Sequence, residues 1–247
     1  MTVYGLIALS FTDVQPNMGE QANPISLPTT DNQVPGVLRG EVWLTVQTRH
    51  AQRLILGRAA TRDKPAITGL LGFADRLRVI WNAARADDPY ADWWLIKIDN
   101  ALGFARNRIK TERAALNECI EQQSALQINV ATADKPHRVA LQFANPYAYW
   151  GAHLIAEFDR TARTVLTAKH VGLINTMEAE RSLGGCASAI RRLFAVPQGY
   201  RALRIDRGSV MAGEEVAQEA ADSMGKLPQA VLLGEHSAAL TPRKARP

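Results

Sequence analysis

The chain has 247 residues, of which 47% are hydrophobic and 21% charged, so it is long and apolar enough to bury a globular core. Its 29 Lys and Arg residues exceed its 24 Asp and Glu residues, and the net charge of +5 favours a polyanionic partner without requiring one. The two cysteines exclude a disulfide framework and lack any spacing that suits zinc.

The composition divides the chain into three parts. Residues 1–36 are rich in Pro, Asn, Gln, Thr and Gly and lack apolar periodicity, which predicts a disordered N-terminal segment. Residues 37–225 show no repeat and no composition shift, which predicts a single mostly helical domain. Residues 226–247 contain prolines and a basic group, which predicts a flexible basic tail.

One apolar run near the start bears on localisation. The run from Val3 to Phe11 is about half the length that a membrane span requires, and no basic segment precedes it. We therefore expect neither export nor a membrane anchor. The expected location is the cytoplasm, in association with the nucleoid.

The first predicted element is a strand at residues 39–48. Its apolar residues alternate with polar ones, and the inward set is Val42, Leu44 and Val46. A helix is predicted for residues 49–60. Turn residues follow, with Asp63 as a candidate N-cap and Pro65 in the first turn of a second helix that ends near Ala86.

The remainder of the domain is predicted to be mostly helical. A helix of roughly 30 residues follows the break at 87–92, and the alternation at 128–132 and 138–143 predicts a β-hairpin. Two further helices are predicted. One runs from Asn145-Pro146 to about Gly172. The other begins at 175, where Asn175 and Glu178 have the spacing of a capping box, and runs to 194, with an interruption at the pair Gly184-Gly185. The fold class is therefore mainly α with a few short strands (α+β).

No motif indicates catalysis. The sequence contains neither a glycine-rich phosphate loop nor a metalloprotease motif, and we expect no enzyme, cofactor or metal. Asp87, Asp88 and Asp92 form the one tight acidic group, which a Mg²⁺-dependent nuclease could use, but their position between two helices favours caps of helix starts.

Three long stretches resemble those of a known family. They are residues 87–97 (DDPYADWWLIK), 141–147 (LQFANPY) and 158–173 (FDRTARTVLTAKHVGL). They are similar to the AcaB-like transcriptional regulators of conjugative plasmids and to related proteins of integrating conjugative elements. The resemblance covers roughly residues 40–230. It implies a DNA-binding regulator of conjugative-transfer genes, with a ribbon-helix-helix-like element in a larger helical body.

Residues 39–86, a strand and two helices, are the first candidate for that element, and residues 138–194 are the second. A lone strand must pair to satisfy its backbone groups, and pairing across a twofold axis would build a two-stranded ribbon that fits a major groove. The expected partners are therefore double-stranded DNA, a second copy of the chain and other proteins of the conjugative element. The alternative function is a non-catalytic structural or accessory protein of the transfer machinery.

The alternation in the first strand also predicts the residues that meet DNA. Arg39, Trp43, Thr45 and Gln47 share the outward face and are expected to read bases. Trp43 is the one tryptophan of five that the pattern places on a polar face. Arg62 and Lys64, next to the helix start expected at Pro65, are expected to hold phosphates.

Overall fold

The computed structural model describes residues 41–123, 125 and 127–244. The sequence-based expectations for residues 1–36 and for Arg39 lie outside the described residues. Within them the chain is mostly helical and carries one two-stranded sheet, which confirms the predicted fold class. The elements, in chain order, are β1 (Val42–Val46), α1 (Arg49–Leu56), α2 (Leu70–Arg85), α3 (Pro89–Glu121), β2 (His137–Leu141), α4 (Pro146–His170), α5 (Thr176–Ala195), the 3-10 helix η1 (Val196–Gly199), α6 (Arg207–Ala212), α7 (Glu215–Met224) and α8 (Gln229–Leu232).

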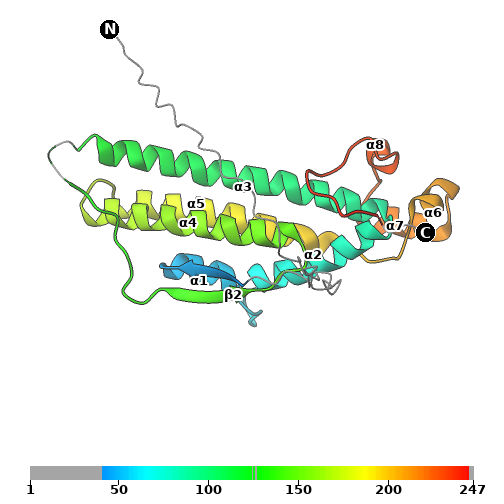
Figure 1. Ribbon diagram of the computed structural model, residues 1–247, viewed down its shortest axis with the longest axis horizontal. Helices are drawn as coiled ribbons and strands as arrows, with labels where there is room; N and C mark the ends of the chain where they lie inside the picture. Colours follow the sequence, from blue (N-terminus) through cyan, green and yellow to red (C-terminus); the bar gives the residue numbers. More distant parts are fainter. Residues whose placement is uncertain (1–40, 124, 126, 245–247) are drawn as a thin grey trace, which may run out of the picture. The chain divides into compact units, whose positions relative to one another are not determined.

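The three long helices α3, α4 and α5 lie side by side and form the body of the domain (Figure 1). α3 has 33 residues, or about 50 Å at 1.5 Å per residue, and begins at Pro89 after the Asp88 N-cap. β2 leads the chain back along the body, so α3 and α4 run in the same direction and α5 returns (Figure 1). The apolar stripes of the three helices meet in one core.

α5 begins as its sequence predicts and continues past the expected interruption. Asn175 and Glu178 form the capping box, in which each side chain binds the other residue's backbone amide. The helix runs unbroken through Gly184 and Gly185. A Cβ at Gly185 would lie 2.9 Å from Nη2 of Arg108, so this glycine gives the arginine of α3 room to approach α5.

β1 finds its strand partner within the same chain. It pairs antiparallel with β2, with Val42 opposite Leu141 and Val46 opposite His137. The hairpin predicted from residues 128–143 is therefore wrong, because residues 127–136 form no strand and 137–141 pair with a strand about ninety positions earlier. Since β2 already satisfies one edge of β1, that strand no longer needs a second protein copy for its pairing.

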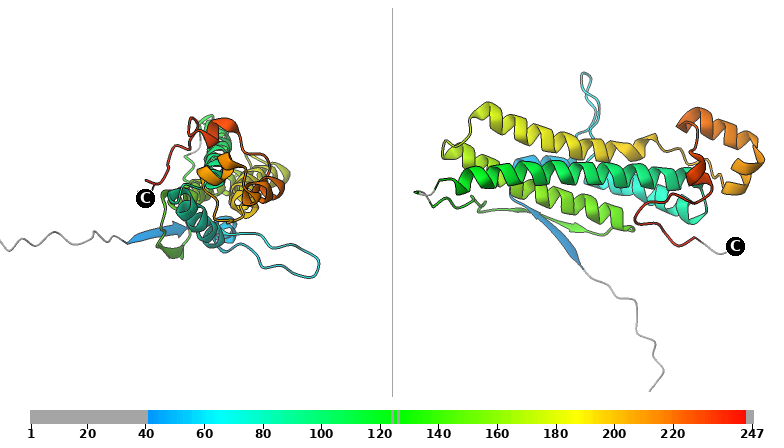
Figure 2. Two further views of the ribbon diagram at one scale, coloured as in Figure 1. Left: turned by 90° about the vertical axis from the view of Figure 1, so that its right-hand side faces the viewer. Right: turned by 90° about the horizontal axis from the view of Figure 1, so that it is seen from above.

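A protruding hairpin replaces the predicted start of the second helix. Residues 57–69, which we call the wing, project from the body between α1 and α2 (Figure 2). Its arms are bridged at Arg58 and Ile67, and again at Thr61 and Lys64 across a tight turn. α2 begins only at Leu70, so Pro65 and the expected Asp63 cap lie outside the helix.

The wing has two glycines at its base. Gly57 has φ +68°, which disfavours a side chain, and a Cβ there would lie 2.3 Å from the carbonyl oxygen of Ile67. A Cβ at Gly69 would lie 2.4 Å from the carbonyl oxygen of Ile55. The backbones cross so closely at these positions that only glycine fits them.

The C-terminal segment, for which composition predicts a flexible tail, makes contacts with the helical body. Val231 and Ala238 are buried, and the amide of Leu240 donates a hydrogen bond of 3.2 Å to the hydroxyl of Tyr147. Arg207 binds the carbonyl oxygens of Val231 and Leu232. Residues 226–244 therefore pack on the helical body although their local sequence suggests a tail.

No helix in the described part of the chain is both long and apolar enough to cross a membrane.

Candidate nucleic-acid interface

The outward face of the sheet carries part of the predicted site. Leu44 and Val46 are buried, while Trp43 and Thr45 are exposed, which confirms the alternation predicted for these four residues. Val42 departs from it, because 42% of this residue is exposed although its direction is inward. Its position at the start of β1 leaves it beside an open groove.

β2 contributes an arginine to the same face. Arg138 lies opposite Thr45 in the register, and its guanidinium carbon lies 4.3 Å from the centre of the Trp43 ring. The indole Nε1 donates a hydrogen bond of 3.1 Å to Glu41, which fixes the plane of the ring. The cation–π contact holds the guanidinium against the Trp43 ring, while the N–H groups at its edge stay available to a ligand.

Gln47 is placed differently from Trp43 and Thr45. β1 ends at Val46, and Gln47 is half-buried, with its side-chain oxygen accepting a hydrogen bond of 2.9 Å from the amide of Ala133. Its own amide donates to Asp159 at 2.9 Å. The structure thus uses Gln47 to hold the segment that precedes β2, at the end of the ribbon.

Asp159 of α4 fixes the corner between β1 and α1. Its carboxylate accepts hydrogen bonds from the amides of Gln47 and Thr48 and from the Thr48 hydroxyl, at 2.9, 2.8 and 2.8 Å. The Thr48 hydroxyl in turn accepts from the amide of Ala51 and caps α1. A single buried carboxylate therefore attaches the sheet and α1 to the helical body.

The predicted phosphate contacts Arg62 and Lys64 lie in the wing. Both side chains are exposed, and within the described residues neither forms an ion pair. They lie beside the turn of the wing, not at a helix start, so the helix amides expected beside them are absent there. Arg58 at the base binds the carbonyl oxygen of Pro65 at 2.9 Å and stiffens the wing.

The two candidate elements considered from the sequence meet in one sheet. Thr45 comes from the first and Arg138 from the second, and β1 and β2 bring them together. Arg39, the remaining predicted reader, lies outside the described residues. The alternation in 138–143 indicates a strand, but no local signal shows that its partner is β1.

The acidic residues Asp87, Asp88 and Asp92 are engaged in a helix cap and in ion pairs. Asp88 caps α3 and accepts a hydrogen bond of 2.6 Å from the Tyr200 hydroxyl, while Arg207 and Lys244 form ion pairs with Asp87 and Asp92. Burial raises the pKa of Asp88 and that of Asp92. Among the described residues no group of three His, Cys, Asp or Glu could hold a metal ion.

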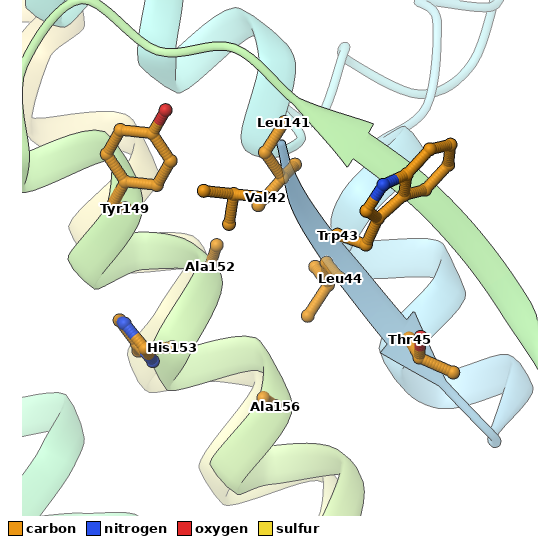
Figure 3. A pocket seen from close by; sticks show the side chains of 9 residues that line it. All are labelled: Val42, Trp43, Leu44, Thr45, Leu141, Tyr149, Ala152, His153 and Ala156. Atoms are coloured by element: carbon orange, nitrogen blue, oxygen red, sulfur yellow. The ribbon is translucent and has the colours of Figure 1, made fainter. Parts of the chain in front are cut away.

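A groove of about 250 Å³ lies between β1 and α4 (Figure 3). Val42 and Leu44 form one wall, and Ala152, Ala156 and the ring of Tyr149 form the other (Figure 3). The groove is mainly apolar, and the edge of β1 that does not face β2 has no strand partner in the described part of the chain. This side of β1 could accept a further protein segment.

The fold and this surface define a mainly helical protein that presents a two-stranded ribbon and a basic wing. The model of the transcriptional regulator AcaB matches residues 34–244, so the chain belongs to the AcaB family of transcriptional regulators. A crystal structure of AcaB from uropathogenic E. coli superposes with a TM-score of 0.54 at 14% identity and covers 79% of this chain and 95% of the AcaB chain. A search of curated proteins gave no match.

Proposed function

We propose that this protein is a sequence-specific DNA-binding regulator of the conjugative-transfer genes of an integrating conjugative element or plasmid. The observation that carries the proposal is the exposed Trp43–Arg138 stack on a two-stranded ribbon, beside Thr45. A major groove admits such a ribbon, and a flat arginine can bind the O6 and N7 atoms of guanine with two hydrogen bonds. Family membership supports a role in transcription.

The wing supplies the sequence-independent part of the interaction. The wing, which projects away from the body (Figure 2), contains Arg58, Arg62 and Lys64 and one acid, Asp63. Cations on such an arm neutralise backbone phosphates and release counterions, which strengthens binding to any duplex. Specificity therefore belongs to the ribbon and general affinity to the wing.

Two substitutions in the ribbon test the reading face. Footprinting of the element's own promoters first locates a binding site, and fluorescence anisotropy then compares that site with unrelated DNA. Arg138→Ala or Thr45→Ala should cost about 1 to 3 kcal/mol on the specific site and little on unrelated DNA. Lys64→Ala should weaken binding to both and flatten the salt dependence.

Arg106 provides a matched control, because its guanidinium carbon lies 4.5 Å from the centre of the Trp150 ring in a second arginine–tryptophan stack, between α3 and α4. Arg106→Ala should leave DNA binding unchanged. Intact specific binding in both ribbon variants would reject the ribbon as the reader. No binding to any element DNA at moderate salt would reject the proposed function and favour an accessory role in the transfer machinery.

We further propose that the protein acts as a homodimer. Because β2 pairs with β1, strand pairing no longer requires a second copy. The other edge of β1, the exposed Val42 and the apolar groove still favour one. Light scattering at micromolar concentration should give twice the chain mass of 27.1 kDa. A monomer that retains its native circular dichroism spectrum would contradict this proposal.

A further inference from the structure

A second, polar cleft lies at the far end of the ribbon. It has a volume of about 370 Å³ and is formed where β1 passes into α1 and where the chain enters β2. Its walls carry two cations, Arg49 of α1 and Lys135, and the imidazole of His137. Gln47 and Gln52 also line it, and no carboxylate does. An oxyanion is the ligand that this combination favours.

Backbone donors add to these side chains. α1 begins at Arg49, and the Thr48 hydroxyl accepts a hydrogen bond from the amide of Ala51 but not from those of Arg49 and His50. No described residue accepts a hydrogen bond from these two amides. The first turn of α1 contains no acid of its own, and the nearby carboxylate of Asp159 binds the amides of Gln47 and Thr48, so those of Arg49 and His50 stay available.

His137 also has a buried ring nitrogen, Nε2, without a hydrogen-bond partner among the described residues. Such unsatisfied groups are uncommon in native structures, because they lose water without gaining another partner. Lys135, next to it in the wall, likewise forms no ion pair with any described residue.

We infer that this cleft binds a phosphate group. A phosphate offers several acceptor oxygens to donors that converge from α1 and from the segment before β2. Its position at the end of the ribbon suits a backbone phosphate of DNA, because phosphates border the groove in which a ribbon lies. A free phosphate-bearing molecule would satisfy the same donors.

The first experiment tests the cleft without DNA. Inorganic phosphate is titrated into the full chain at constant ionic strength, and the amide resonances of Arg49 and His50 are followed by NMR. They should shift saturably, and Lys135→Gln should weaken the fitted affinity at least about fivefold, since a charge-assisted hydrogen bond contributes at least about 1 kcal/mol. Lys110→Gln, an exposed lysine on α3, is the control and should change nothing.

The second experiment, which rests on the proposed function, identifies the source of the phosphate. If DNA supplies it, Lys135→Gln reduces affinity for all duplexes because about one phosphate contact is lost. Raising the salt concentration from about 50 to 200 mM should then lower the DNA affinity of the variant about 3.5-fold less than that of the wild type. If Lys135→Gln lowers phosphate affinity but leaves DNA binding unchanged, the ligand is a free phosphate compound.

The two experiments fail separately. Absence of any saturable shift with phosphate, together with unchanged DNA affinity and salt dependence in Lys135→Gln, would overturn the inference while the proposed function stands. Absence of DNA binding in the wild type would overturn the proposed function, and the phosphate titration would still decide whether the cleft is an anion site.

Discussion

Asp159 offers the sharpest test of how this surface is held in place. Only 4% of the residue is exposed, and its carboxylate accepts hydrogen bonds from two backbone amides and one hydroxyl at the corner between β1 and α1. Asp159→Ala would leave these three donors without an acceptor. Hydrogen bonds to a charged group contribute about 1.5 to 3 kcal/mol each. The substitution also removes the cost of desolvating a buried carboxylate, which offsets part of this loss.

We therefore expect Asp159→Ala to lower the free energy of unfolding by about 3 kcal/mol. For a domain of this size, that loss corresponds to a fall in melting temperature of about 6 to 12 °C. Calorimetry or urea denaturation measures the change. The control is Glu157→Ala on the same helix, since no described residue is hydrogen-bonded or ion-paired with the Glu157 side chain. A loss in Asp159→Ala no greater than in the control would refute the reasoning.

Three further predictions concern the cap, the wing and the N-terminal segment. Burial raises the pKa of Asp88 in the folded state, so the folded protein binds this proton more readily than the unfolded chain does. The free energy of unfolding therefore increases as pH falls from the raised pKa of the folded state towards the ordinary pKa of the unfolded chain. Asp88→Asn cannot titrate and should lack this increase in denaturation curves measured across this interval; identical pH profiles would contradict it. Gly69→Ala should loosen the wing and weaken binding to all DNA, because the new Cβ would lie 2.4 Å from the carbonyl oxygen of Ile55. Gly103→Ala is the control and should leave binding intact, because a Cβ added there meets no neighbouring element within 4 Å. Deletion of residues 1–36 should leave the melting transition almost unchanged, and a fall of many degrees would show that this segment packs on the core.

The two parts of the proposed DNA-binding surface are attached to the body in different ways. Trp43 and Arg138 lie on a ribbon that Asp159 fixes to α4, whereas Arg62 and Lys64 lie in a wing that contacts the body only at its base. Base reading needs side chains held within narrow geometric limits, while phosphate contacts tolerate movement because they depend mainly on charge. The proposed division of roles follows from this difference.

Local patterns in the sequence determined the elements whose stability is local. The apolar stripe and the Asp88-Pro89 start predicted the long helix α3, and the spacing of Asn175 and Glu178 predicted the capping box of α5. Period-two alternation predicted that Leu44 is buried and that Trp43 is exposed. These features depend on neighbours within a few residues, so a single sequence contains the information.

Tertiary structure alone decided the partners of these elements. The pairing of β1 with β2 joins residues about ninety positions apart, and no local rule distinguishes it from a hairpin at 128–143 or from pairing with a second copy. The same contact brings Arg138 onto the Trp43 ring and forms the proposed reading face. Arg207 also binds the carbonyl oxygens of Val231 and Leu232, in a segment whose local composition predicts a flexible tail. In each case the deciding free energy comes from contacts distant in sequence, which composition and periodicity do not record.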